Sequence, residues 1–210
     1  YVVSCAGVAP AGALLTSPVK MFTRAFDINA AANVVLAQAF LPAMISNNHG
    51  HFMTVASSAS YFSLPNLCAY SMSKTAALAF LESLRAELRA VYKACRVRTS
   101  VVTPTKVRTV LAEGLNEGDD DFLMPVLEPI QVARAMADTL NSGLSRNISL
   151  PLGSALLPYL RALPEWYRGA LRAMGNTDAL VTPESISRGQ QALRGHQSNL
   201  DHMKKLGVHS

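Results

Sequence analysis

The sequence predicts an α/β fold built around a parallel β-sheet. Short segments rich in valine, isoleucine and threonine alternate with longer segments in which apolar residues recur every three or four positions. Strands that alternate with helices in this way are typical of βα units, whose strands lie parallel. Half of the 210 residues are hydrophobic and 16% are charged, which suits a globular domain with a substantial core.

The first part of the chain supplies two strands and one long helix. Residues 1–4 predict a short apolar strand, and residues 51–56 predict the second strand. Between them, residues 20–45 have the helical period, and Pro42 is expected to kink or end that helix. Its expected buried stripe consists of Phe22, Phe26, Val34, Ala37 and Leu41.

The clearest helix follows a loop at residues 57–65 and covers residues 70–92. Apolar residues recur along it at three- and four-residue steps, which predicts one buried face. That face consists of Leu78, Leu81, Leu84, Leu88 and Val91. A third strand follows at residues 97–102 and ends before Pro104.

The last part of the chain is less regular. Residues 105–127 are polar and irregular, and Pro129 opens a helix that reaches about residue 140. Residues 147–150 predict a fourth strand, and residues 156–174 predict one or two short helices. The polar tail from residue 182 is expected to be poorly ordered.

Composition argues against several classes of protein. The net charge is +5, but the 19 basic residues are scattered, which argues against a nucleic-acid surface. Three cysteines far apart argue against a disulfide framework and fit a reducing compartment. His49 and His51 lie near no third metal ligand, so we expect turn residues there. The longest apolar stretch, residues 30–45, is shorter than the ~20 residues of a membrane span.

The strongest chemical signal is the pair Tyr70 and Lys74 at the start of the clearest helix. Residues four apart lie on one face of a helix. A phenol has a pKa near ~10, and a neighbouring ammonium group lowers it by favouring the phenolate. The pair can therefore donate and accept the proton of an alcohol or carbonyl group. The alternative is an exposed helical pair without function, because the spacing is common by chance.

Three further segments occur in a fixed order around this pair. Residues 54–58 (Thr-Val-Ala-Ser-Ser) end a strand, and their first serine precedes the tyrosine by thirteen residues. Residues 27–29 (Asp-Ile-Asn) lie in the first long helix, and residues 104–109 (Pro-Thr-Lys-Val-Arg-Thr) follow the third strand. Over about residues 1–152 this set resembles the short-chain dehydrogenase/reductase family, above all its retinol dehydrogenase and 17β-hydroxysteroid dehydrogenase type 11 branch. The resemblance implies a Rossmann-like, doubly wound parallel sheet.

The resemblance implies four catalytic roles. Tyr70 would be the general acid and base, and Lys74 would lower its pKa and bind the ribose of a nicotinamide cofactor. Ser57 would donate a hydrogen bond to the substrate oxygen, and it is preferred over Ser58 because the family spacing to the tyrosine is thirteen. Asn29 would hold a water that links the lysine to a proton relay; an ordinary polar helix residue is the alternative.

The resemblance also implies contacts to NAD or NADP, with NADP favoured. Ala6 and Gly7 match the end of the family's Asn-Asn-Ala-Gly segment, which here reads Ser-Cys-Ala-Gly, and would approach the adenine ribose. Pro104 begins the segment that corresponds to the family's Pro-Gly, here Pro-Thr. Val107 and Thr109 would lie beside the nicotinamide amide.

The glycine-rich phosphate loop of the family does not occur in the sequence. By resemblance the chain begins at the family's fourth strand, so it lacks the first three βα units of about 30 residues each. Two functions follow. The first is an NAD(P)-dependent oxidoreductase for an apolar alcohol and its carbonyl compound. The second is a truncated, non-catalytic remnant or dimerising scaffold.

We expect three regions and a limited set of partners. Residues 1–152 would form the catalytic part of the Rossmann domain, residues 153–181 a helical lid and residues 182–210 a polar tail. The expected partners are an apolar alcohol or carbonyl substrate and a second copy of the chain, with no nucleic acid. The aromatic, leucine and arginine residues of the segment 156–168 allow a peripheral membrane contact. The expected location is cytoplasmic, or peripheral on the endoplasmic reticulum or lipid-droplet membrane.

Overall fold

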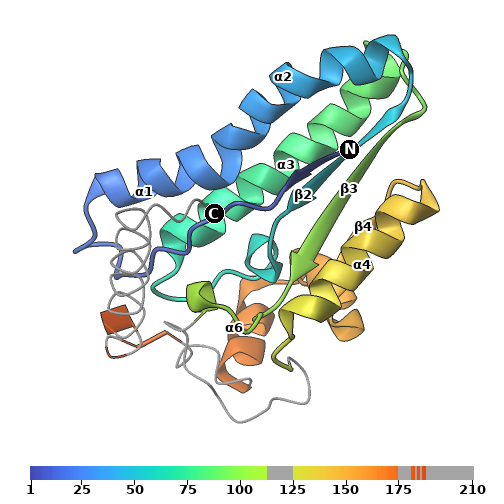
Figure 1. The fold of residues 1–210 in the computed structure, drawn as a ribbon. Coiled ribbons are helices and arrows are strands. Elements are labelled where there is room, and N and C mark those ends of the chain that lie inside the picture. The colour runs from blue at the N-terminus through green and yellow to red at the C-terminus, as the bar shows by residue number, and fades with distance from the viewer. Residues whose placement is uncertain (113–124, 175–180, 183, 185, 188–210) are drawn as a thin grey trace, which may run out of the picture.

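A four-stranded parallel sheet forms the centre of the molecule (Figure 1). The structure is a computed structural model that describes residues 1–112, 125–174, 181–182, 184 and 186–187. The strands lie in chain order as β1 (Val2–Ser4), β2 (Gly50–Val55), β3 (Val97–Pro104) and β4 (Asn147–Leu150). The predicted α/β fold with a parallel sheet is confirmed, because all four predicted strands are present.

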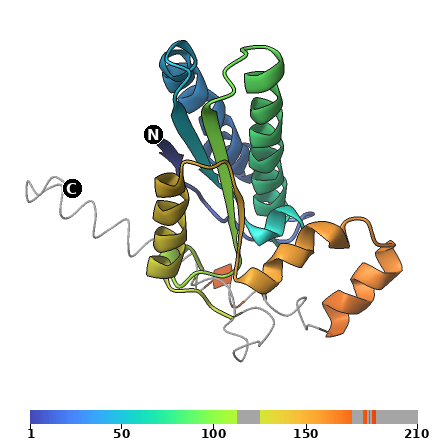
Figure 2. The same ribbon diagram turned by 90° about the vertical axis from the view of Figure 1, so that its right-hand side faces the viewer.

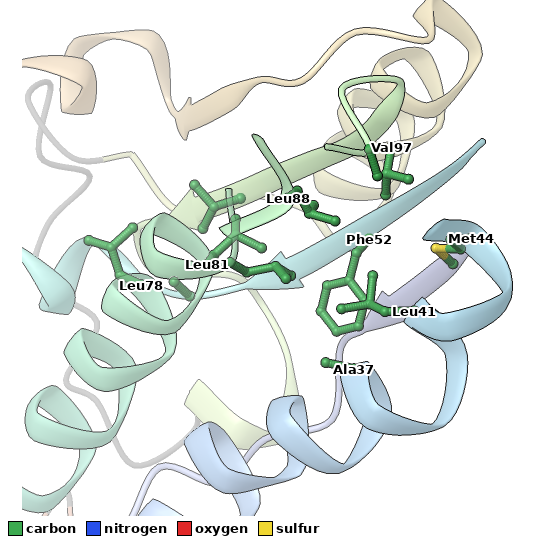
Figure 3. Packing of buried hydrophobic residues seen from close by; sticks show 12 residues of the cluster. Ala37, Leu41, Met44, Phe52, Leu78, Leu81, Leu88 and Val97 are labelled. Atoms are coloured by element: carbon green, nitrogen blue, oxygen red, sulfur yellow. The ribbon is translucent and has the colours of Figure 1, made fainter. Parts of the chain in front are cut away.

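Helices cover both faces of this sheet (Figure 2). One face packs against α2 (Ala32–Ser46) and α3 (Cys68–Ala90), and the other packs against α4 (Pro129–Ser142). The larger core lies under α2 and α3, and Figure 3 labels eight of its residues: Ala37, Leu41, Met44, Phe52, Leu78, Leu81, Leu88 and Val97. The smaller core, under α4, contains Met53, Val102, Leu127 and Val132. This three-layer arrangement is doubly wound.

The first long helical segment differs from the prediction because it is interrupted. It consists of α1 (Val19–Phe26), a π-helical turn (Asp27–Ala31) and α2. The wide turn shifts the buried face, so Phe26 and Val34 of the expected stripe are exposed by 47% and 42%. Pro42 does not end the helix, which continues to Ser46.

This segment is also longer than its apolar stretch suggested. Over Val19–Ser46 the helix is long and apolar enough to cross a membrane, by length and composition alone. In the structure the same helix packs against the sheet and buries the amides of Asn29 and Asn33. Burial of hydrogen-bonded polar side chains is a property of a core helix, so the length alone does not indicate a membrane span.

Two smaller predictions are wrong. α3 ends at Ala90, so Val91 lies outside the helix and is 64% exposed. His51 is not a turn residue: it is buried in β2, where its Nε2 lies 2.8 Å from Ser100 Oγ. Among the described residues, no group of three or more His, Cys, Asp or Glu side chains is placed to hold a metal ion.

The C-terminal region packs beside the loop that follows β2. A 3₁₀ turn (Leu152–Leu156) precedes the predicted short helices, α5 (Leu157–Leu160) and α6 (Glu165–Met174). The guanidinium of Arg172 in α6 lies 5.6 Å from the ring centroid of Phe62. Asn66, which has a positive φ of 60°, donates from Nδ2 to Val181 O (2.8 Å) and accepts at its own carbonyl from the Gly12 amide (2.8 Å).

Other segments of the chain add short 3₁₀ turns at Ser58–Ser60 and Val110–Ala112. The rest of the predicted irregular segment, at 113–124, lies outside the described residues, as does almost all of the predicted tail.

Candidate active site

Four sequence-predicted residues come together at the carboxyl end of the sheet. Ser57 lies two residues after the end of β2, and Tyr70 and Lys74 lie in the first two turns of α3. Asn29 lies in the π-helical turn and packs against the same end of α3. Because parallel strands present their carboxyl ends at one edge, this edge is the expected place for a ligand.

The side chains of Ser57 and Tyr70 meet at this edge of the sheet. Ser57 has an extended backbone and caps the 3₁₀ turn that follows, and its Oγ accepts a hydrogen bond from the Ala59 amide (3.1 Å). That bond fixes the hydroxyl and leaves its proton free to be donated, and the Ser57 side chain hydrogen-bonds to Tyr70. Ser58 begins the following 3₁₀ turn and has no such bond to the tyrosine among the described contacts. The geometry favours Ser57 over Ser58.

Lys74 is buried, with 4% of its surface exposed. Its Nζ donates a hydrogen bond to the carbonyl oxygen of Val55 at the end of β2 (2.8 Å). Burial lowers the pKa of Lys74 to about 8, because the charged ammonium is removed from water. The same Nζ lies 6.0 Å from the centroid of the Tyr70 ring.

The pKa of Tyr70 differs in direction from the sequence expectation. Burial raises it above its ordinary value, and the hydrogen bond with Ser57 lowers it by less. The Lys74 ammonium does not offset this rise in pKa, because it is hydrogen-bonded to Val55 O and lies 6.0 Å from the centroid of the tyrosine ring. The tyrosine is therefore protonated at neutral pH in this state, which is the form that donates a proton.

Asn29 joins three segments through its side-chain amide. Its Oδ1 accepts from the Val8 amide, and its Nδ2 donates to the Val8 carbonyl and to Ser73 Oγ, each at 2.8 Å. Ser73 Oγ in turn donates to the backbone carbonyl of Tyr70 (2.8 Å). The side chain of Asn29 thus ties the loop after β1 to the turn of α3 that carries the tyrosine.

Gly7 approaches this network closely. A Cβ on Gly7 would lie 3.1 Å from Asn29 Oδ1 and 3.2 Å from Lys74 Nζ. Contacts this short are tighter than ordinary packing, so the position favours a residue without a side chain. Ala6, directly before it, is exposed.

The remaining predicted residues follow β3, one strand further along the sheet. Pro104 is buried at the end of that strand, and Val107 forms a bridge with Leu127. Thr109 is exposed and donates its hydroxyl proton to the Val107 carbonyl (3.3 Å). The described contacts do not join these three residues to Tyr70 or Lys74.

Ser73 and the backbone of Val8 are site residues that the sequence reasoning missed. Ser73 is adjacent to Lys74, but its partner Asn29 lies 44 residues away. A single sequence has no periodic signal for a pair so distant. A buried serine directly before the lysine was the only available sign.

Comparison with known proteins identifies the family of the chain. A family model described as short chain dehydrogenase matches residues 1–120. The chain is 37% identical over 172 residues to estradiol 17-beta-dehydrogenase 11 of Homo sapiens, an alignment that covers 81% of this chain and 55% of the relative. It is 36% identical over 135 residues to epidermal retinol dehydrogenase 2 of Mus musculus, which covers 64% and 43%. The chain spans about half the length of the curated relatives it matches.

Solved structures share the fold. A gluconate 5-dehydrogenase from Burkholderia cenocepacia, in complex with NADP and tartrate, superposes with a TM-score of 0.62 at 17% identity, over 73% of this chain and 63% of that one. A 3-oxoacyl-[acyl-carrier protein] reductase from Brucella melitensis with bound NAD gives a TM-score of 0.58 at 21% identity, over 71% and 59%. With the match over residues 1–120, the chain belongs to the short-chain dehydrogenase family.

Proposed function

We propose that this chain carries the catalytic centre of an NAD(P)-dependent oxidoreductase that interconverts an apolar alcohol and its carbonyl compound. One observation supports this proposal most strongly: four side chains lie together at one edge of the sheet, those of Ser57, Tyr70, Lys74 and Asn29. The names of the relatives, a steroid dehydrogenase and a retinol dehydrogenase, support an apolar substrate.

Each residue has a distinct part in the proposed reaction. The phenol of Tyr70 donates its proton to the carbonyl oxygen in reduction and takes it back from the alcohol in oxidation. The hydroxyl of Ser57, fixed by the Ala59 amide, donates a hydrogen bond to the same oxygen and stabilises its developing charge. Asn29 is a positioning residue in this structure, because its amide is used by Val8 and Ser73.

The residues present fit the nicotinamide-ribose end of a dinucleotide. Lys74 is buried, yet among the described residues its three N–H donors form one hydrogen bond, to Val55 O. The remaining donors suit the hydroxyls of a ribose, and Gly7 leaves the space beside them open. The bound nicotinamide would supply or accept the hydride. Ala6, Pro104, Val107 and Thr109 remain proposed contacts, as does the preference for NADP.

Replacement of Tyr70 by phenylalanine tests the proposal. We expect Y70F to lose at least about a hundredfold in turnover, because the phenol proposed to transfer the proton to the substrate oxygen is removed. Turnover is measured by loss of NADPH or NADH fluorescence with retinal, a long-chain aldehyde and a steroid ketone. The matched control is Y92F, which removes the same hydroxyl from an exposed tyrosine beyond the end of α3. Equal loss in both variants, or none in Y70F, would contradict the role of the tyrosine.

The non-catalytic scaffold remains the second candidate, and titration of the 210-residue chain with NADPH and NADH separates the two. Enhanced nicotinamide fluorescence that is lost in K74M supports the enzyme. No binding of either cofactor by the folded chain supports the scaffold. The two titrations also compare NADP with NAD directly.

Two surfaces support the proposed partners. Exposed apolar residues of α2, including Val35 and Phe40, suit pairing with a second copy of the chain. Around α5 and α6, Tyr159 and Trp166 are 72% and 75% exposed, which suits peripheral contact with a membrane. Sedimentation equilibrium tests the dimer. Flotation with phosphatidylcholine vesicles tests the membrane contact, and a double variant W166S/Y159S that floats as well as the parent would exclude it.

The lid role of residues 153–181 is proposed for the same region. Arg172 packs on Phe62, in the loop that follows Ser57, so α6 lies beside that loop, which supports the proposed role.

A further inference from the structure

A second cavity lies at the opposite end of α3 from the proposed active site. It has a volume of about 270 Å³ and lies between the last turns of α3, the start of β3 and the segment that precedes β4. Fifteen residues of helix separate Lys74 from Arg89, which is about 22 Å along the axis. Figure 1 shows the loop from α3 to β3 at the far end of the sheet from the loop that follows β2. The cavity is therefore separate from the site described above.

Three arginines line this cavity: Arg85, Arg89 and Arg98. Its floor is apolar and buried, and consists of Leu88, Ala94 and Val97. No carboxylate of the described residues forms an ion pair with any of the three guanidinium groups. The cavity thus gathers three uncompensated positive charges against a low-dielectric wall, which strengthens their field.

Two of the guanidinium groups are held in place by neutral partners. Arg85 donates from Nε to Thr99 Oγ1 (2.9 Å) and from Nη2 to Thr99 O (3.2 Å) and Asn147 Oδ1 (3.0 Å). Arg98 donates from Nε to Gly143 O (3.0 Å) and from Nη1 to Cys95 O (3.3 Å). These bonds orient the groups and leave N–H donors on each. Arg89 makes no hydrogen bond or ion pair with the described residues.

A structural role explains only part of this arrangement. A cation in the last turn of a helix stabilises the helix through its macrodipole, and Arg89 is in the last turn of α3. Arg85 lies one turn earlier and Arg98 lies in the strand, so the helix terminus does not account for them. Their bonds to backbone and amide oxygens position the charges without neutralising them.

We propose that this cavity binds the phosphate group of a small soluble phosphate monoester. A phosphate carries up to two negative charges and three terminal oxygens, which matches several guanidinium forks better than a single carboxylate does. The volume suits a small molecule, and the buried apolar floor suits the part that carries the phosphate.

Cys95 is a built-in reporter for this proposal, because its side chain lines the cavity and is exposed. The control is the same thiol in the double variant R89Q/R98Q, because Cys5, although also exposed, interacts electrostatically with Lys74 and is itself near a cation. We alkylate the folded 210-residue chain with iodoacetate, which is an anion, and with iodoacetamide, which is neutral. Mass spectrometry gives the rate at Cys95. We expect the ratio of the two rates at Cys95 to be about tenfold higher in the parent chain than in the double variant, since a cationic site concentrates anions.

Inorganic phosphate is the probe for occupancy. As its concentration rises, inorganic phosphate should slow the alkylation of Cys95 by iodoacetate until the rate reaches a plateau. Sodium chloride at the same ionic strength should not have this effect. The double variant R89Q/R98Q should lose both the high rate ratio and the protection. R96Q, which removes one positive charge beside Cys95 from a residue that does not line the cavity, should keep the protection. Circular dichroism verifies that each variant is folded.

Three results would overturn the proposal. Equal rate ratios at Cys95 in the parent chain and in the double variant would exclude a cationic site. Protection that rises with chloride as it does with phosphate would be general screening. Protection by phosphatidic acid vesicles but not by inorganic phosphate would identify a lipid surface instead of a small ligand. None of these outcomes depends on dehydrogenase activity, so this experiment tests the phosphate site independently of the proposed function.

Discussion

Replacement of Asn29 by leucine tests the network that holds the proposed active site together. Leucine branches at the same γ atom as asparagine but is larger and its side chain makes no hydrogen bonds; the control below introduces the same increase in volume. The change removes three buried or half-buried hydrogen bonds of 2.8 Å, two to the backbone of Val8 and one to Ser73. Each such bond contributes about 1 kcal/mol net, so the free energy of unfolding should fall by about 3 kcal/mol.

Urea denaturation followed by circular dichroism measures this loss. With a slope of about 2–3 kcal/mol per molar for a chain of this size, the midpoint should fall by about 1 M. The matched control is N33L. Asn33 also makes three hydrogen bonds, to Asn29 O, Ala30 O and Thr54 Oγ1, but contacts neither Val8 nor Ser73.

Both variants should be destabilised, but only N29L should also weaken cofactor binding, because only Asn29 ties α3 to the loop that carries Gly7 and Val8. An N29L midpoint equal to that of the parent chain would refute the network. Equal effects of the two variants on cofactor binding would refute the positioning role.

The other predictions concern His51 and Gly7. Burial lowers the pKa of His51 below 6.5, so the unfolded chain takes up its proton first as the pH falls. Stability should therefore decrease below about pH 6.5, and H51Q should flatten that part of a urea midpoint–pH profile; an unchanged profile would contradict the assignment. G7A places a Cβ 3.1–3.2 Å from Asn29 and Lys74, and the crowding should cost about 1–3 kcal/mol in urea denaturation. A G7A chain as stable as the parent would indicate that the loop moves freely.

The sheet was predictable from the sequence because its signals are local. Short apolar segments followed by a glycine or proline mark β1, β3 and β4, β2 begins at a glycine, and the leucine period of α3 marks its buried face down to Leu88. Each of these signals depends on neighbours within a few residues. The pair Tyr70 and Lys74 is local in the same sense, since one turn of helix fixes its geometry.

The first long helix was only partly predictable, because a π-helical turn changes its phase. A period of 3.6 residues that holds before Asp27 does not hold after Ala31, so one continuous stripe places Phe26 and Val34 on the wrong side. The hydrogen bonds of Asn33 to the carbonyls of that turn help stabilise it. Such a bond depends on the fold around it and has no periodic signature.

The protonation and hydrogen bonding of the proposed active-site side chains were the least predictable features. The proximity of lysine to tyrosine predicts a lowered pKa for the phenol. Burial of the phenol has the larger effect, however, and raises its pKa. The bond of Lys74 to the end of β2 joins residues 19 apart, and no spacing rule anticipates it. Electrostatics of this kind depends on the solvent that the fold excludes.

Asn66 has a consequence for how the molecule opens. It accepts from the Gly12 amide and donates to the Val181 carbonyl, so the loop after β1, the loop before α3 and the C-terminal region meet at one residue. Opening of the loop before α3 releases both bonds at once, whereas opening of either of the other two segments releases one. In native-state hydrogen exchange, the Gly12 amide should therefore exchange whenever the loop after β1 or the loop before α3 opens, and a ligand that holds both loops closed should slow the exchange of an amide that it never touches.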